Sequence, residues 1–395
     1  MQAVRNAIPA GPDAEPGETL AYDRWLIGAV MLMCAFGLIM VASASIEIST
    51  RYMGDPMHYF WRQFAAAGIG IGGALVMIRI PLRMLEKLSA FALIASILLL
   101  ALVLVPGLGR MVNGSMRWID FGAFGLQASE PVKLLMLIYV AGYLVRHQSQ
   151  VRSEFIGFIK PIGLMTIISG LLLLEPDYGS TVVIFGTTLG MLFLGGVPLL
   201  RFTAWGLVAV SALMSLAVLA PYRMQRLMTF MDPWADPFNS GFQLTQALIA
   251  FGRGEMFGVG LGSSVQKLFY LPEVHTDFIY AVVGEELGLA GSVAVILGFT
   301  FIVWRILRIG AQAESRNEFF AAYAAYGVAF LIGIQAFINI GVNMGVLPTK
   351  GLTLPLLSYG NNSMIITWLA LGLVLRVSYE TGGIAKIRRG GGARE

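Results

Sequence analysis

The apolar residues of this chain are grouped in long runs, and polar segments separate one run from the next. A helix needs about 20 apolar residues to cross a bilayer. Pro176 can either kink one long segment or separate two, and both interpretations stay open. The pattern predicts an all-α polytopic membrane protein with about ten transmembrane helices. The expected spans are residues 25–45, 60–78, 89–106, 131–145, 161–176, 180–197, 202–220, 278–304, 319–346 and 363–378.

The composition supports a membrane protein and excludes several other classes. Hydrophobic residues make up 57% of the chain and charged residues 13%, which is about half the charge of a soluble domain. The single cysteine, Cys34, excludes an intrachain disulfide. The three histidines, His58, His147 and His275, do not have the spacing of a zinc site.

Charged residues outside the apolar runs predict the orientation. Most lysines and arginines fall in the loops on the same side as the two termini, so we expect both termini in the cytoplasm. We divide the chain into a flexible cytoplasmic tail (1–24), a membrane domain (25–378) and a basic cytoplasmic tail (379–395). Most of the remaining cations cluster in the outer loops 106–130 and 221–276, which indicates an anionic ligand on the outer side.

A polar loop leads into a long apolar helix in the stretch YLPEVHTDFIYAVVGEELG. Thr276 is a candidate N-cap, and Asp277 lies at the joint. A helix N-terminus favours a carboxylate, so we expect Asp277 to be charged at neutral pH and able to accept a proton. A capping role alone is the alternative. Glu285 and Glu286 lie about 12 Å further along the helix, where carboxylates are costly unless they face protein or a cavity.

Two pairs in the loop 106–130 and just after it are further candidates. Arg117 and Trp118 are suited to contact an anion and a sugar or lipid, or to anchor the chain at the membrane interface. Glu130 and Lys133 are three residues apart at a helix start, so they share a face. A charged pair at the mouth of a span is a functional-site hypothesis, with a helix-starting ion pair as the alternative.

The later outer segments have distinct patterns. NSGFQLTQALIAFG has a helical repeat that predicts a helix along the membrane surface. GRGEMFGVGLGSS is rich in glycine and either offers backbone N–H groups to a phosphate or, as we expect, serves as a flexible connector. LPTKGLTLPLLSYGNNSM predicts a re-entrant or tightly packed loop beside the site.

Three motifs resemble those of the SEDS family (shape, elongation, division and sporulation), and their residues resemble FtsW-like members rather than RodA-like members. They are QKLFYLPEVHTDFIYAVVGEELG, PTKGLTLPLLSYG and NGSMRWIDFGAFGLQASEPVK. The resemblance covers the chain from about Asp23 to Glu380. It implies ten spans, an active site on the periplasmic side, and polymerisation of lipid II into glycan strands at the division septum of the bacterial inner membrane.

The resemblance also implies roles for individual residues. The essential catalytic carboxylate of the family corresponds to Asp277, and the Ser-Glu-Pro-x-Lys motif begins at Ser129. Asn361 and Asn362 depart from the family, which reads Ser-Tyr-Gly-Gly-Ser-Ser where this chain has Ser-Tyr-Gly-Asn-Asn-Ser from Ser358 to Ser363. Asparagine tolerates left-handed backbone better than most residues. A divalent cation, Mg²⁺ or Mn²⁺, is a possible cofactor. The candidates for binding or supporting the substrate are Glu130, Lys133, Arg117, Trp118, Arg226, Lys267, His275, Lys350 and Ser358, with Glu285 and Glu286 as intramembrane carboxylates.

The expected partners also follow from the resemblance. They are lipid II, a class B penicillin-binding protein transpeptidase of the FtsI type, and divisome regulators of the FtsQ/FtsL/FtsB and FtsN type; we expect no nucleic acid. Two other functions stay open. A lipid II flippase needs an access path to both faces and has no need of a carboxylate at the outer helix end, whereas a non-catalytic divisome scaffold tolerates the loss of Asp277.

Overall fold

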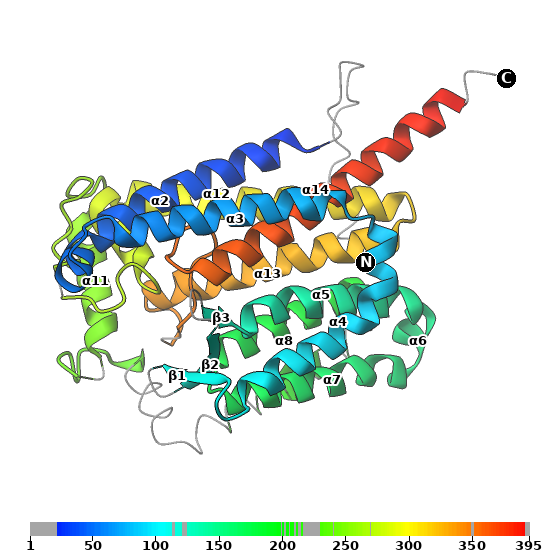
Figure 1. Ribbon diagram of the computed structural model, residues 1–395, viewed down its shortest axis with the longest axis horizontal. Coiled ribbons are helices and arrows are strands. Elements are labelled where there is room, and N and C mark those ends of the chain that lie inside the picture. The colour runs from blue at the N-terminus through cyan, green and yellow to red at the C-terminus, as the bar shows by residue number, and fades with distance from the viewer. Residues whose placement is uncertain are drawn as a thin grey trace.

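The computed structural model describes residues 22–391, apart from 113–114, 121–124, 199, 201–202, 205, 209–210, 212–214, 216–229, 240, 269 and 349–350. Figure 1 shows a long bundle of helices that run along one axis. Arg226, Lys350, the predicted tail up to residue 21 and most of the expected span at 202–220 lie outside the described residues.

The expected spans other than 202–220 coincide with helices, which confirms the polytopic all-α fold. Among the described helices, seven are long and apolar enough to cross a membrane, and α8 is shorter. Pro176 separates two helices, because α7 ends at Leu174 and α8 begins at Tyr178. The helices are α2 (Arg24–Met53), α3 (His58–Arg79), α4 (Leu82–Val103), α5 (Ser129–Arg146), α6 (Gln148–Ser153), α7 (Phe155–Leu174), α8 (Tyr178–Leu194), α11 (Phe242–Gly254), α12 (Ile279–Ser315), α13 (Phe319–Asn343) and α14 (Asn361–Gly391).

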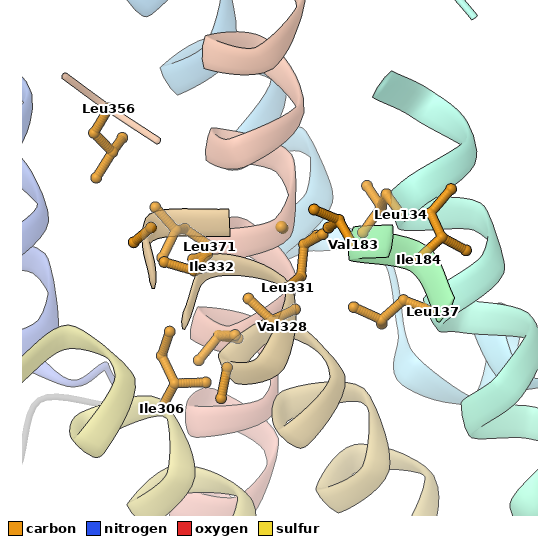
Figure 2. Close-up of a cluster of buried hydrophobic side chains, with 14 of the residues drawn as sticks. Leu134, Leu137, Val183, Ile184, Ile306, Val328, Leu331, Ile332, Leu356 and Leu371 are labelled. Atoms are coloured by element: carbon orange, nitrogen blue, oxygen red, sulfur yellow. The ribbon is translucent and has the colours of Figure 1, made fainter. Parts of the chain in front are cut away.

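Helix α13 forms the centre of the bundle. It packs against α5, α8, α12 and α14, and 67% of its most apolar 18-residue window is buried, against 28% for α3 and α4. Figure 2 shows apolar side chains of α13 and of the segments that pack around it. This core includes Leu134, Leu137, Val183, Ile184, Ile306, Val328, Leu331, Ile332, Leu356 and Leu371.

The start of α2 and the end of α14 lie at the same end of the bundle (Figure 1). The rings of Tyr22 and Tyr379 stack with their centroids 5.2 Å apart, and Asp23 forms an ion pair with Arg305 of α12. A chain that crosses a membrane an even number of times has its two termini on one side, so this arrangement agrees with the expected topology.

The outer loop 106–130 contains a small antiparallel sheet that we did not predict. Its strands are β1 (Gly109–Val112), β2 (Ser115–Asp120) and β3 (Gly125–Gln127), in the order β1-β2-β3. The strands are too short to give a clear alternating pattern in the sequence. Within β2, Arg117 shares a face with the buried Ile119, so the sheet directs the Arg117 side chain towards the protein interior.

Candidate functional site

Asp277 lies two residues before the start of α12, as the sequence predicted, but Thr276 does not cap the helix. Phe278 occupies the N-cap position without a side-chain hydrogen bond. The Thr276 hydroxyl instead donates to the backbone oxygen of Glu273 (3.0 Å) and to its carboxylate (2.9 Å). These bonds stabilise the turn that carries Asp277.

Two asparagines of α13 fix the backbone at Asp277. The side-chain amides of Asn339 and Asn343 each donate to the Asp277 carbonyl oxygen at 2.9 Å. The Asn343 side-chain oxygen accepts from the backbone N–H of Ala281, in the first turn of α12, at 3.1 Å. The central helix of the bundle therefore holds both the carboxylate-bearing residue and the helix start that follows it.

The Asp277 carboxylate is partly buried and packs against the segment that precedes α14. A Cβ atom added to Gly351 would lie 3.2 Å from Oδ2 of Asp277. Burial, together with a smaller effect of the nearby Glu273 carboxylate, raises the pKa of Asp277 to about 7, and the Arg117 guanidinium opposes both effects. Our expectation of a fully charged Asp277 is therefore wrong, because burial outweighs the favourable helix end.

Arg117 links the sheet to the connection between α7 and α8. Its Nε donates to the Glu175 carbonyl oxygen at 3.1 Å and its Nη2 to the Pro176 carbonyl oxygen at 2.6 Å. The Glu175 side chain is fully buried, and neither carboxyl oxygen has a hydrogen-bond partner in the described structure. Burial and the Asp177 charge raise the pKa of Glu175 to about 8, while Arg117 lowers it. The guanidinium thus acts electrostatically on both Glu175 and Asp277.

Trp118 remains half-buried beside the sheet. Its indole ring packs over β3, where a Cβ atom added to Gly125 would lie 3.1 Å from Cε3 of the ring. Trp118 pairs in register with Gln127. The ring therefore braces the sheet that positions Arg117.

His275 joins the loop before α12 to the loop before α14, and Ser358 bonds within the second of these loops. The His275 ring is buried against Tyr59 and Tyr359, with centroids 4.7 and 5.5 Å away, and its backbone oxygen accepts from the Tyr359 N–H at 2.8 Å. Burial lowers the pKa of His275, so the ring is neutral at pH 7. The Ser358 hydroxyl accepts from the Leu354 N–H at 2.8 Å. The segment before α14 is tightly packed, as predicted.

Glu130 and Lys133 form the buried pair that their spacing predicted. Lys133 Nζ lies 2.8 Å from the Glu130 carboxylate and 3.1 Å from the Gln335 side-chain oxygen. Gln335 in turn donates to the Thr353 carbonyl oxygen at 3.0 Å. The adjacent cavity measures about 10 Å³, which is room for one water molecule. This pair supports the segment next to Asp277 from within the bundle.

Glu285 and Glu286 anchor the loop between α11 and α12, and Lys267 belongs to the same network. Both carboxylates are fully buried. Hydrogen bonds and counter-charges offset the cost of burying them. The Glu286 carboxylate accepts hydrogen bonds from the Ser43 hydroxyl (2.7 and 2.8 Å) and from Lys267 (3.1 Å). The Glu285 carboxylate accepts from the Ser264 hydroxyl and from the backbone N–H groups of Val265 (3.0 Å) and Gln266 (3.3 Å). The Arg253 guanidinium lies 3.6 Å from the Glu285 carboxylate.

The glycine-rich segment is hydrogen-bonded to α12, so the expectation of a flexible connector is wrong. Helix α12 is interrupted at Gly288, whose backbone angles are φ 64° and ψ −160°. The glycine-rich segment packs against this interruption. It makes hydrogen bonds with the backbone groups of α12 that the interruption leaves without helical partners. The bonds run from Val259 N to Glu285 O (3.0 Å), Gly260 N to Glu286 O (3.1 Å), Leu289 N to Glu255 O (2.9 Å) and Ala290 N to Met256 O (3.1 Å).

Sequence analysis missed several residues that shape the site. Gln335, Asn339 and Asn343 are spaced by four residues in an apolar helix, and this polar stripe was the available signal. Asn361 and Asn362 begin α14 without left-handed backbone. The Asn362 side chain donates to the Gly125 carbonyl oxygen at 3.0 Å, so it ties α14 to the sheet.

The geometry combines one proton acceptor with one nearby cation. The described residues contain no group of three or more histidine, cysteine or acidic side chains arranged to hold a metal ion. Asp277, with a pKa near neutrality, is suited to take a proton from a hydroxyl group. The Arg117 guanidinium is suited to stabilise negative charge that develops beside it.

Comparisons with known proteins identify close relatives over nearly the whole chain. The proteins named "Probable peptidoglycan glycosyltransferase FtsW" of Coxiella burnetii and Nitrosococcus halophilus are 51% and 53% identical to it over 361 and 365 residues. These matches cover 91% and 92% of this chain, and 97% and 94% of the relatives.

Solved structures share the fold. A chain from the structure described as "Structural coordination of polymerization and crosslinking by a peptidoglycan synthase complex" superposes with a TM-score of 0.75 at 30% identity, covering 92% of this chain and 99% of that chain. The rod shape determining protein RodA of Thermus thermophilus gives a TM-score of 0.68 at 29% identity, covering 91% and 97%. The family model of the cell cycle proteins FtsW, RodA and SpoVE matches residues 23–382, so this chain belongs to that family.

Proposed function

We propose that this chain is a peptidoglycan glycosyltransferase that polymerises lipid II into glycan strands for septal cell-wall synthesis. The observation that carries the proposal is the carboxylate of Asp277, held before α12 with a pKa of about 7 and within the electrostatic reach of Arg117. A general base is most effective when its pKa lies near the working pH. The names of the relatives agree with this activity.

The proposed reaction is a single inverting displacement. Asp277 takes the proton from the 4-hydroxyl group of the acceptor sugar as its oxygen attacks the anomeric carbon of the donor. The new glycosidic C–O bond forms while the bond from that carbon to the undecaprenyl pyrophosphate breaks. The leaving group departs with the bonding electrons, so negative charge grows on its phosphate oxygen and needs a nearby cation.

Among the described candidates, Arg117 is the cation that we assign to the leaving group. Lys133 and Lys267 are each neutralised by a buried glutamate, at 2.8 and 3.1 Å. Arg117 bonds to two backbone carbonyls and to no carboxylate among the described contacts, so its charge is available to an anion. Arg226 and Lys350 remain proposed pyrophosphate ligands, and a Mg²⁺ or Mn²⁺ ion remains a proposed companion of the pyrophosphate.

The setting of the reaction is also a proposal. The protein works in the bacterial inner membrane at the division septum, with both termini in the cytoplasm and Asp277 on the periplasmic side. Its partners are a class B penicillin-binding protein of the FtsI type and regulators of the FtsQ/FtsL/FtsB and FtsN type. The structural relative from a peptidoglycan synthase complex supports a partnership between polymerising and crosslinking subunits.

The decisive experiment measures polymerisation of labelled lipid II by the purified protein with its transpeptidase partner. Asp277→Asn should lower the rate at least about 100-fold, because a general base contributes that much or more. The variant should fold as well as the wild type, since burial disfavours the charge that the substitution removes. Asp120→Asn is the control, because it removes a carboxylate from a surface ion pair of the sheet.

Four results are informative. Long strands from the wild type and from Asp120→Asn, with none from a folded Asp277→Asn, would establish the glycosyltransferase and its base. Equal polymer from all three would assign the base to another residue. If none of the three proteins made polymer but labelled lipid II crossed vesicle membranes, the protein would be a flippase. If there were neither polymer nor movement of lipid II, it would be a scaffold.

A further inference from the structure

A cavity of about 490 Å³ lies between α5 and α7, at the end of the bundle that carries α6 and is opposite to α11 and the sheet (Figure 1). This volume is within the range of small-molecule sites. Neither Asp277 nor any other proposed site residue lines it. The lining residues are Tyr139, Tyr143, Arg146, His147, Ile159, Lys160, Gly163 and Leu164.

The lining of this cavity is cationic. Arg146 and Lys160 are exposed at its wall, and no lining residue carries a carboxylate. The Ser89 hydroxyl, 2.6 Å from Nη1 of Arg146, holds the guanidinium in place. Lys160 forms no ion pair within the described part of the chain. Nδ1 of His147 is buried without a hydrogen-bond partner there. Through Arg146 and Lys160, the cavity therefore offers positive charge to an anion.

The cavity opens towards the side of the bundle. Residues Ile156, Lys160, Gly163, Ile167 and Leu174 are exposed and follow one face of α7 at helical spacing. In a membrane-spanning helix such a stripe faces lipid. Two of its members, Lys160 and Gly163, also line the cavity. A Cβ atom added to Gly163 would meet no atom within 4 Å, so the missing side chain leaves the wall open.

We propose that this cavity binds the phosphate headgroup of an anionic phospholipid in the adjacent leaflet, with its acyl chains along the outward face of α7. Basic pockets between transmembrane helices are suited to anionic headgroups. The sideways opening favours a ligand that arrives within the membrane. The proposal is independent of the glycosyltransferase activity, because the site lies at the other end of α5 from the pair Glu130 and Lys133.

Native mass spectrometry of the full-length protein tests the proposal. The detergent-solubilised protein is mixed with phosphatidylglycerol, with phosphatidylcholine of the same chain length, or with inorganic phosphate alone. We expect retention of phosphatidylglycerol over phosphatidylcholine. Lys160→Gln should weaken that retention about fivefold, the effect of one cation near an anionic headgroup. Gly163→Phe should weaken it at least as much, because the ring occupies part of the cavity.

Two matched control variants test whether the effects come from this cavity or from any lost charge or any added ring on the surface. Lys87→Gln removes an exposed cation from α4, and Gly170→Phe adds a ring on the same exposed face of α7 but outside the cavity. Both should retain phosphatidylglycerol as the wild type does. Equal retention by Lys160→Gln and Lys87→Gln would overturn the proposal even if Gly163→Phe misfolded. If the protein bound inorganic phosphate but not the lipid, the cavity would be a site for a soluble anion, and the proposal of a phospholipid ligand would be wrong.

Discussion

The ammonium group of Lys267 lies 3.1 Å from the carboxylate of Glu286, and both side chains are buried. Lys267 also donates to the Gly262 carbonyl oxygen at 2.6 Å. The sequence made Lys267 a candidate for binding pyrophosphate, but its position makes it the counter-charge of an intramembrane glutamate. Removing one partner of a buried pair leaves an uncompensated charge, which is costly.

Lys267→Met should therefore destabilise the protein by about 3–5 kcal/mol. The double variant Lys267→Met/Glu286→Gln should recover much of that loss, because no unpaired charge remains. Thermal unfolding of the purified protein in detergent measures both effects. If Lys267→Met kept its melting temperature but lost polymerisation, Lys267 would act in substrate binding, as the sequence indicated.

The rate of polymerisation should rise with pH through about 7. The base acts in its deprotonated form, and the pKa of Asp277 is raised to about 7, so its active fraction is small at pH 6 and nearly complete at pH 8. The measurement is kcat/KM for lipid II between pH 5.5 and 8.5, a range chosen to be about 1.5 units on each side of that pKa. A rate that is constant from pH 6 to pH 8 would contradict this role of Asp277.

Two substitutions should move that pH dependence in opposite directions. Glu273→Gln removes a negative charge that raises the pKa of Asp277, so the midpoint should move to lower pH. Arg117→Gln removes a positive charge that lowers the same pKa, so the midpoint should move to higher pH. Arg117→Gln should also lower the maximal rate, because the leaving group loses its cation. Shifts in the same direction would contradict the electrostatic assignment.

The backbone contact between the glycine-rich segment and α12 can be tested with a matched pair of glycines. Gly258 and Gly262 have φ of 80° and 83°, so alanine is strained by about 1–2 kcal/mol at either position. A Cβ atom at Gly258 would lie 2.1 Å from the Glu286 carbonyl oxygen, whereas at Gly262 it would meet no atom within 4 Å. Gly258→Ala should therefore lower the melting temperature clearly more than Gly262→Ala. Equal effects would mean that the segment separates from α12 in solution.

Much of the fold was predictable because a bilayer leaves few choices to a spanning segment. Backbone groups in lipid must be satisfied within the segment, so each apolar run becomes a helix. The pairing of Glu130 with Lys133 was predictable for a similar reason, since it depends only on a spacing of three residues.

The remaining features depend on segments far apart in the sequence. The pKa of Asp277 reflects burial by the chain around Gly351 and a charge from β2, neither of which its own neighbours reveal. The partners of Glu286 come from residues 19 and 243 positions away. The interruption at Gly288 is stable only because another segment supplies its hydrogen bonds. A single sequence contains these glycines and glutamates but not their contacts.

The interruption of α12 has a mechanical consequence. Its first part, which begins two residues after Asp277, is bonded through its last carbonyls to the glycine-rich segment. The buried glutamates attach it to the loop that follows that segment. These three pieces must move together, because separating them would expose unpaired backbone groups and two charges. A force on this loop would therefore be transmitted to the first part of α12, and it would reach Asp277 only against the hydrogen bonds from Asn339 and Asn343 of α13.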